Sequence, residues 1–357
     1  MDSMGTSQNR HWTYQSTRGD PGVMTTSPPA TDVPEPPTMR DVLAAARRID
    51  GLVVRTPALR HPELDRAAAA AGADGATLVV KHENLQHTGA FKVRGALNLL
   101  LGFDEAERRR GIVAYSTGNH AQALAHAARR TGTGCTIVMP RHPNPLKERA
   151  VRDLGADVVL HGDTFDDARG RAGELAAAGG ARLVGAANEP VLVAGVATAT
   201  LELLEQAPDL EVLVVPVGGG SGAAAACLVA AALAPGLRVV AVQAAASPAA
   251  HDSWRAGELR TAANTTRAEG LAVGCGFALT QAVLRERLAD FLLVDDDAIA
   301  AAQRAYLTGA RTVAEGAGAA ALAAVLTHPA AFAGRRVGVV CSGGNASEAE
   351  LRHALGA

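Results

Sequence analysis

Lys92 is the residue whose type and surroundings most directly suggest chemistry. The chain of 357 residues contains three lysines, Lys81, Lys92 and Lys147, and its other basic residues are arginines. Phe91 and Val93 flank Lys92 with apolar side chains, and apolar surroundings favour the neutral, nucleophilic amine. An arginine stays protonated and cannot form an imine. Lys92 is therefore a candidate for covalent catalysis, and the alternative is a surface lysine on a helix formed by "FKVRGALNLL".

A glycine-rich turn is a candidate site for an anion. Its members, between an apolar strand and an alanine-rich helix, are Gly218, Gly219, Gly220, Ser221 and Gly222. Backbone N–H groups at such a turn and at a helix start bind phosphate. A dinucleotide site is the alternative, because Gly220-x-Gly222-x-x-Ala225 matches the Rossmann fingerprint. That site needs an acidic residue after the next strand, where the chain has Gln243, so a phosphate monoester is the favoured ligand.

Two further strand-to-helix turns carry polar groups. The first contains Ser116, Thr117, Gly118 and Asn119, whose hydroxyls and backbone donors suit a carboxylate. In the second, Ser342 ends a late apolar strand, and its hydroxyl can hydrogen-bond a heterocyclic nitrogen. Each turn alone is equally compatible with ordinary capping and turn residues. His120 and His126, which follow the first turn, are interpreted as a first-turn helix residue and a helix-surface residue.

The elements that must position these turns form an alternating pattern. Short apolar runs such as "TLVV", "GIVAY", "CTIVMP", "VLVVPV", "RVVAV" and "VGVVC" are mostly separated by helix-length, alanine-rich segments. Such a pattern predicts parallel sheets with helices on both faces, and ligands then bind beyond the carboxyl ends of the strands. Residues 1–37 are rich in proline and predicted to be a disordered tail. Thr38 and Asp41 predict the capped start of the first helix.

Composition excludes several classes of protein. A net charge of -2 without a basic stripe argues against nucleic-acid binding. The longest apolar runs are shorter than a membrane span, and the N-terminus lacks a signal-peptide core. The four cysteines lie far apart, without CxxC pairs or histidines at ligand spacing, which favours buried thiols in a reducing cytoplasm over disulfides or zinc.

Taken together and in this order, the motifs resemble a known family. They are "VRTPAL", "KHENLQHTGAFKVRGALN", "STGNHAQALA", "VMPRHPNPLKERAVRDLGADVVLHG", "VPVGGGSG", "AEGLAVG", "AEGAGAAALAAVL" and "CSGGN". From about Asp41 to its end the chain resembles the fold-type II pyridoxal-phosphate (PLP) enzymes, tryptophan synthase β-like α/β proteins, and within them the serine/threonine dehydratase and serine racemase branch. The expected function is β-elimination from a β-hydroxy amino acid of the L-threonine or L-serine type, giving a 2-oxo acid and ammonia.

The resemblance implies a role for each matching residue. Lys92 is expected to bind PLP covalently and to exchange protons at Cα of the substrate. The other residues expected to contact the cofactor are Phe91, Asn119, Gly218, Gly219, Gly220, Ser221, Gly222, Gly270, Glu315 and Ser342. Those expected around the substrate are Ser116, Thr117, Gly118, Asn119, His120, His87 and Ala90. A neutral hydroxyl at Ser342 leaves the ring nitrogen largely unprotonated, which suits elimination of a β-leaving group.

Several positions depart from the family pattern. Dedicated dehydratases usually carry alanine where this chain has Thr117, and serine racemase carries a catalytic serine there, so Thr117 is a second candidate catalytic residue and racemisation is an alternative. His87 and Ala90 replace a frequent arginine and serine, which leaves open a specialised substrate such as 3-hydroxyaspartate or a hydroxyectoine-derived amino acid. Gln243 and Ala249 stand where related enzymes have cation ligands, so no metal site is expected.

The resemblance also predicts the domain organisation. Residues 38–110 and 189–357 are expected to form a large PLP-binding domain, and residues 111–188 a small, mobile substrate-binding domain. The active site is expected in the cleft between them. The protein is expected to be a cytoplasmic homodimer that acts on a small amino acid and binds neither nucleic acid nor membrane. A nicotinamide dehydrogenase is the alternative from another class, but it leaves Lys92 unexplained.

Overall fold

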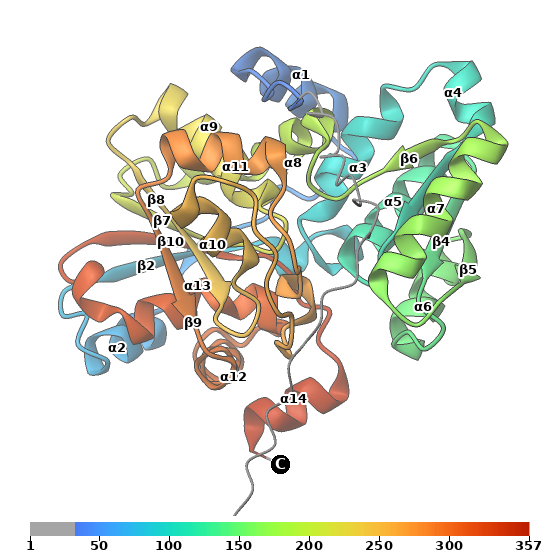
Figure 1. The fold of residues 1–357 in the computed structure, drawn as a ribbon. Coiled ribbons are helices and arrows are strands. Elements are labelled where there is room, and N and C mark those ends of the chain that lie inside the picture. The colour runs from blue at the N-terminus through green and yellow to red at the C-terminus, as the bar shows by residue number, and fades with distance from the viewer. Residues whose placement is uncertain (1–32, 357) are drawn as a thin grey trace, which may run out of the picture. The chain divides into compact units, whose positions relative to one another are not determined.

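The computed structural model describes residues 33–356 (Figure 1). Of the predicted tail, residues 1–32 lie outside the described residues, and residues 33–37 precede the first helix without regular structure. The helix α1 (Met39–Ile49) begins with the predicted capping box, in which Thr38 and Asp41 each bond the other's backbone N–H. This sequence prediction is confirmed.

Six strands form the larger sheet, in the order β1-β2-β10-β7-β8-β9. They are β1 (Ala58–Arg60), β2 (Thr77–His82), β7 (Val212–Pro216), β8 (Arg238–Ala244), β9 (Asp290–Val294) and β10 (Arg336–Cys341). All neighbouring pairs are parallel except β1 with β2, which is antiparallel. The sequence predicted parallel strands throughout and did not predict β1, because its three residues are half-exposed or exposed and carry no apolar run.

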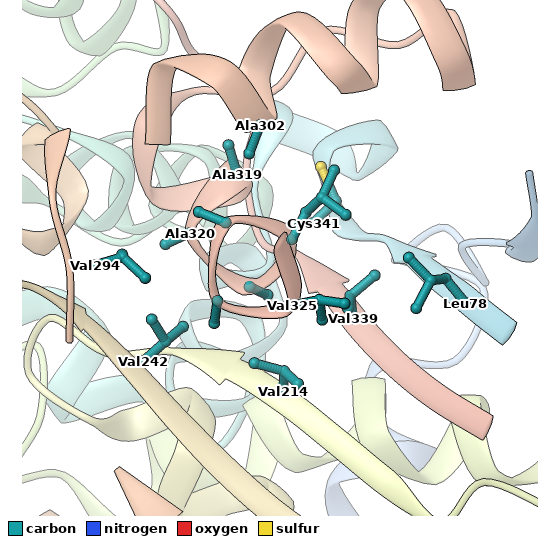
Figure 2. Packing of buried hydrophobic residues seen from close by; sticks show 14 of the residues in the cluster. Leu78, Val214, Val242, Val294, Ala302, Ala319, Ala320, Val325, Val339 and Cys341 are labelled. Atoms are coloured by element: carbon teal, nitrogen blue, oxygen red, sulfur yellow. The ribbon is translucent and has the colours of Figure 1, made fainter. Parts of the chain in front are cut away.

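Both faces of this sheet are covered, as continuous apolar strands require. Leu78 and Val80 of β2 belong to the core on one face, whereas Val79 belongs to the core on the other face. The first core, shown in Figure 2, is completed mainly by α13 (Gly316–Thr327), with α2 (Pro62–Ala70) and α12 (Asp296–Ala305). The second is completed by α8 (Pro190–Gln206), α9 (Ser221–Leu233) and α11 (Ala278–Arg287).

Four parallel strands form the smaller sheet, in the order β5-β4-β3-β6. They are β3 (Ile112–Tyr115), β4 (Cys135–Met139), β5 (Asp157–Leu160) and β6 (Arg182–Val184). One face packs with α5 (Asn119–Thr131) and α3 (Lys92–Leu101), and the other with α7 (Phe165–Gly179). The smaller sheet therefore lies within residues 111–188, which the sequence assigned to a separate domain.

The remaining elements connect these layers. They are α4 (Glu105–Arg110), α6 (Pro145–Asp153), α10 (Ala249–Ala256), α14 (Glu348–Leu355), the short helices η1 (Glu83–Leu85), η2 (His87–Gly89), η3 (Glu269–Leu271) and η5 (Pro329–Ala331), and a π-helical turn η4 (Tyr306–Ala310).

Two glycines allow α3 and α8 to pack with their backbones almost in contact. A Cβ added to Gly95 would lie 2.7 Å from the Leu192 carbonyl oxygen, and one added to Gly195 would lie 2.6 Å from the Arg94 carbonyl oxygen. Such distances exclude any side chain unless the helices separate. The close approach fixes the position of α3, whose first residue is Lys92.

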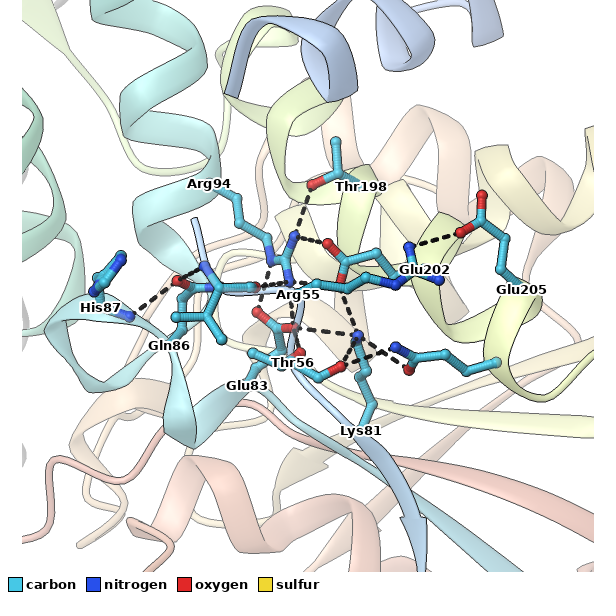
Figure 3. Close-up of polar contacts among 12 residues, drawn as sticks. Arg55, Thr56, Lys81, Glu83, Gln86, His87, Arg94, Thr198, Glu202 and Glu205 are labelled. Atoms are coloured by element: carbon cyan, nitrogen blue, oxygen red, sulfur yellow. Dashed lines mark hydrogen bonds and ion pairs between the residues drawn. The ribbon is translucent and has the colours of Figure 1, made fainter. Parts of the chain in front are cut away.

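A buried network of charges holds the same helix (Figure 3). Arg94 donates from Nε and Nη2 to the Glu83 carboxylate at 2.8 and 2.9 Å, and from Nη1 to Glu202 at 2.7 Å. Lys81 donates to Glu202 at 2.7 Å and to the Thr56 carbonyl oxygen at 2.7 Å. Two cations and two carboxylates thus neutralise one another beneath the helix that carries Lys92.

Candidate active site

Lys92 lies where the carboxyl ends of the two sheets meet. Its Nζ donates to the Ser221 hydroxyl at 2.8 Å, at the start of α9 after β7, and to the Ala186 carbonyl oxygen at 3.4 Å, shortly after β6. The Phe91 ring centroid is 5.0 Å from Nζ. Among the ion pairs of the described residues none involves Lys92, and burial lowers the pKa of its ammonium group to about 8. An amine with this pKa is partly neutral, and therefore nucleophilic, near neutral pH, so the surface-lysine alternative is wrong.

The glycine turn, Gly218 to Gly222, is the candidate phosphate cradle, and it packs too closely against its neighbours to carry side chains at its first positions. A Cβ added to Gly218 would lie 2.5 Å from the Gly270 carbonyl oxygen, and one added to Gly219 would lie 2.9 Å from the Ala187 Cβ. Gly220 has a φ of 90°, a conformation that side chains other than glycine rarely adopt. The Thr280 hydroxyl donates to the Gly219 carbonyl oxygen at 2.9 Å and fixes the turn. The turn therefore requires glycines, and it leads into the start of α9, which no side chain caps and where backbone N–H groups can bind a phosphate.

The polar turn after β3 leads into α5, whose first residue is Asn119. Asn119 donates from Nδ2 to Glu315 Oε1 at 2.5 Å, and its Oδ1 accepts from Asn345 Nδ2 at 2.8 Å. These two bonds fix the orientation of the Asn119 amide. The Ser116 hydroxyl accepts from the Gly118 backbone N–H at 3.3 Å, and no side chain caps the start of α5. The free backbone donors there suit a carboxylate.

His120 is buried directly after this turn. Burial and the charge of Lys92 lower the pKa of its imidazole to about 3, so the ring is neutral at physiological pH. Its Nε2 has no hydrogen-bond partner among the residues that the structure describes. The sequence interpretation of His120 as a first-turn helix residue is confirmed. The effect of the Lys92 charge on the His120 pKa also places His120 at the site.

Glu315 is the least expected member of the site. The resemblance alone assigned it, and the structure buries it at the start of α13, where burial raises the pKa of its carboxyl group to about 7, while the charge of Lys147 and the bond from Asn119 oppose that rise. Oε1 is so close to Gly343 that a Cβ there would lie 2.3 Å away. A carboxyl group with such a pKa changes charge near neutral pH.

Ser342, Ala90 and His87 complete the predicted set. The Ser342 hydroxyl donates to the Ala317 carbonyl oxygen at 3.3 Å, and its own carbonyl accepts from the Phe91 N–H at 3.1 Å, which joins the end of β10 to the segment before Lys92. Ala90 is buried and forms an isolated bridge with Gly343. His87 stacks on His126, with ring centroids 5.7 Å apart. His126, interpreted from the sequence as a helix-surface residue, lies on α5 and is half-buried, because η2 covers that side of the helix.

Two residues of the site were not assigned from the sequence. Asn345 orients Asn119, and its place in "CSGGN" was the only signal for it. Lys147 has the same rarity as Lys92 and could have been found by that criterion. Within residues 33–356 no group of three or more His, Cys, Asp or Glu side chains could hold a metal ion. No helix in that part of the chain is long and apolar enough to cross a membrane.

Comparisons with known proteins identify the family. Residues 49–343 match the family described as "Pyridoxal-phosphate dependent enzyme". The chain is 38% identical to an L-threonine ammonia-lyase of Thermotoga maritima, over 86% of this chain and 75% of that one. It is 36% identical to a beta-hydroxyaspartate dehydratase of Paracoccus denitrificans, over 87% and 96% of the two chains. The solved serine racemase of Dictyostelium discoideum is similar in structure, with a TM-score of 0.81 and 30% identity over 87% and 99% of the two chains.

The chain belongs to the pyridoxal-phosphate dependent enzymes, with the predicted fold-type II architecture. Its cofactor is pyridoxal 5'-phosphate, and its function is that of a β-eliminating ammonia-lyase, as the sequence predicted. The described residues fit this cofactor. Lys92 supplies an amine that forms no ion pair among the described residues, and the glycine cradle leads into the uncapped start of α9, whose backbone N–H groups can bind a phosphate.

Proposed function

We propose that the protein deaminates a β-hydroxy amino acid of the L-threonine or L-serine type to a 2-oxo acid and ammonia. The observation that carries this is the position of Lys92, whose amine lies at the phosphate cradle and close enough to His120 to affect its pKa. An amino acid bound by its carboxylate at the start of α5 would have its Cα near that amine. The 38% identity to a threonine ammonia-lyase supports the choice of substrate.

The side chains have separate tasks in this proposal. When bound, PLP accepts the electrons released as the Cα–H bond breaks. The turn from Gly218 to Gly222 would hold the phosphate, and Asn119 would donate to the ring hydroxyl oxygen with its remaining N–H. Lys92 removes the Cα proton as a neutral amine. Ser342 would present an uncharged hydroxyl to the ring nitrogen, and the neutral His120 would add no charge beside the substrate carboxylate.

A second substrate class is favoured by a specific observation. Relatives that act on hydroxyaspartate are as similar to this chain as several threonine enzymes, at 36% identity. His87 and Ala90 also differ from the frequent residues of the family, and both lie in the segment that precedes Lys92. We therefore propose 3-hydroxyaspartate as the alternative substrate.

Turnover measurements decide between the candidates. Purified protein reconstituted with PLP is incubated with L-threonine, L-serine and 3-hydroxyaspartate, and the 2-oxo acids are identified as 2-oxobutanoate, pyruvate and oxaloacetate. Chiral chromatography on the same samples detects D-amino acids. The highest kcat/KM identifies the substrate. If D-products outweigh 2-oxo acids for every substrate, or if no 2-oxo acid forms, the proposed deamination is wrong.

We propose that residues 111–188 move as a small domain and close over the substrate, and that the enzyme is a cytoplasmic homodimer. Closure excludes water from the reacting groups. Light scattering gives the oligomeric state, and small-angle scattering with and without a non-reactive amino-acid analogue detects closure as a smaller radius of gyration. An unchanged radius on saturation would contradict the movement.

A further inference from the structure

Lys147 is a buried lysine that the reaction outlined above does not use. It lies on α6, which connects β4 to β5 of the smaller sheet, and only 8% of it is exposed. Burial of an ammonium group is costly unless the group is paired and hydrogen-bonded. Because the chain uses arginine at nearly every other basic position, a buried lysine here calls for a specific partner.

The direct partner of Lys147 comes from the other sheet. Its Nζ donates to Glu269 Oε2 at 2.5 Å. Glu269 begins η3, which contains Gly270, the neighbour of Gly218 in the glycine turn, and packs against α13. The ion pair therefore joins a helix of the smaller sheet to the rim of the cofactor pocket on the larger sheet.

The charge of Lys147 also affects a second carboxyl group, that of Glu315. The Lys147 ammonium group lowers the pKa of Glu315, which burial otherwise raises. Glu315 also faces Glu269 of η3 and Glu350 of α14, whose charges raise its pKa, and the Cys341 thiol of β10 lies nearby. After burial, the charge of Lys147 is the largest influence on the pKa of Glu315.

Glu315 connects the charge of Lys147 to the cofactor pocket through its hydrogen bond with Asn119. Its Oε1 accepts from Asn119 Nδ2, and Asn345 holds the opposite end of the same amide. An ionised Glu315 is a pure acceptor, which suits the Asn119 N–H, whereas a protonated Glu315 can itself donate and no longer fixes the amide. The orientation of Asn119 therefore depends on a charge that Lys147 brings from α6.

We propose that Lys147, which is held between the two sheets by its ion pair with Glu269, is a positioning residue whose charge keeps Glu315 ionised and so fixes the Asn119 amide for the reaction. This role rests on the proposed placement of PLP beside Asn119. If the two sheets move apart, Lys147 and Glu269 return to water, and Glu315 stays buried without its counter-charge. Closure of the two sheets therefore favours the ionised form of Glu315.

The test compares Lys147→Met with Lys147→Arg in the reconstituted enzyme. Loss of the cation raises the pKa of Glu315 further, so the acid limb of the kcat–pH profile of Lys147→Met is expected to move to higher pH by about one unit. At pH 7 this corresponds to a roughly fivefold lower kcat. The visible circular dichroism of the bound cofactor, which reports its orientation, should lose intensity over the same pH range. Lys147→Arg should restore both properties.

Two further variants keep the outcome decisive. Arg141→Met breaks an exposed ion pair with Asp163 that does not cross between the sheets, and it should change neither the limb nor the dichroism. Glu269→Gln removes a negative charge that raises the pKa of Glu315 and keeps an oxygen that can accept from Lys147, so it should move the limb to lower pH. If Lys147→Met does not fold, a limb of Glu269→Gln that moves to higher pH contradicts the proposal. If Lys147→Met lowers kcat equally at every pH, the proposed role is wrong. If no visible chromophore forms on the wild-type protein, the placement of the cofactor fails instead.

Discussion

The buried charge network gives a prediction whose size can be worked out from the structure. Arg94 is fully buried and makes two hydrogen bonds to Glu83 and two to Glu202, between 2.7 and 2.9 Å. In Arg94→Met, Glu83 stays fully buried with only Thr56 as a close donor and Lys81 at 4.0 Å. Removal of one partner from a buried pair costs about 3–5 kcal/mol. We expect Arg94→Met to lose this much free energy of unfolding.

A double-mutant cycle measures the interaction itself. Glu83→Gln combined with Arg94→Met removes one charge of each sign and leaves Lys81 paired with Glu202 at 2.7 Å. The double variant should therefore be more stable than the sum of the two single losses implies, by about 1–3 kcal/mol. Urea denaturation of the reconstituted enzyme, followed by far-ultraviolet circular dichroism, provides the free energies.

An exposed pair serves as the matched control for the cycle. Arg55 and Glu205 form an ion pair 2.8 Å apart in which both side chains are more than half exposed. Arg55→Met should cost less than about 1 kcal/mol. If Arg94→Met costs no more than Arg55→Met, or if the two losses at Arg94 and Glu83 simply add, the reasoning from buried charge is refuted.

The other predictions concern the cofactor and substrate. Lys92→Ala should abolish the attachment of PLP to the protein by borohydride reduction and lower kcat by about 10²- to 10⁴-fold. Normal turnover would exclude Lys92 as the base. In the protein without PLP, labelling of the Lys92 amine should increase with pH around a midpoint near 8, because burial lowers its pKa, and a midpoint near 10 would contradict that burial. Gly218→Ala should weaken PLP binding by a cost of roughly 1–3 kcal/mol, since its Cβ would lie 2.5 Å from the Gly270 oxygen; an unchanged titration would show that the cradle can widen. Thr117→Ala should abolish any D-product and preserve elimination, whereas equal loss of both would argue against a proton-donating Thr117.

Much of the site was predictable because its parts are local in the sequence. Gly218 to Gly222 between a strand and a helix indicates an anion cradle from the chemistry of glycine and helix ends alone. Lys92 is conspicuous because an arginine cannot replace a nucleophilic amine. The strands β1, β6 and β9 were missed. β1 and β6 are only three residues long, whereas β9 carries the apolar run Phe291–Val294 and could have been predicted from the sequence.

The sequence by itself determined the types of groups at the strand ends and their order, since these follow from residue identity and local periodicity. Only the tertiary structure decided how those groups act on one another. The bond from Asn119 to Glu315 joins residues 196 positions apart, and the Lys147–Glu269 pair joins residues 122 positions apart. The pKa of Glu315 depends on burial beneath segments distant in the chain. Electrostatic effects depend on distance and solvent exclusion in space, and the packing of the two sheets sets both.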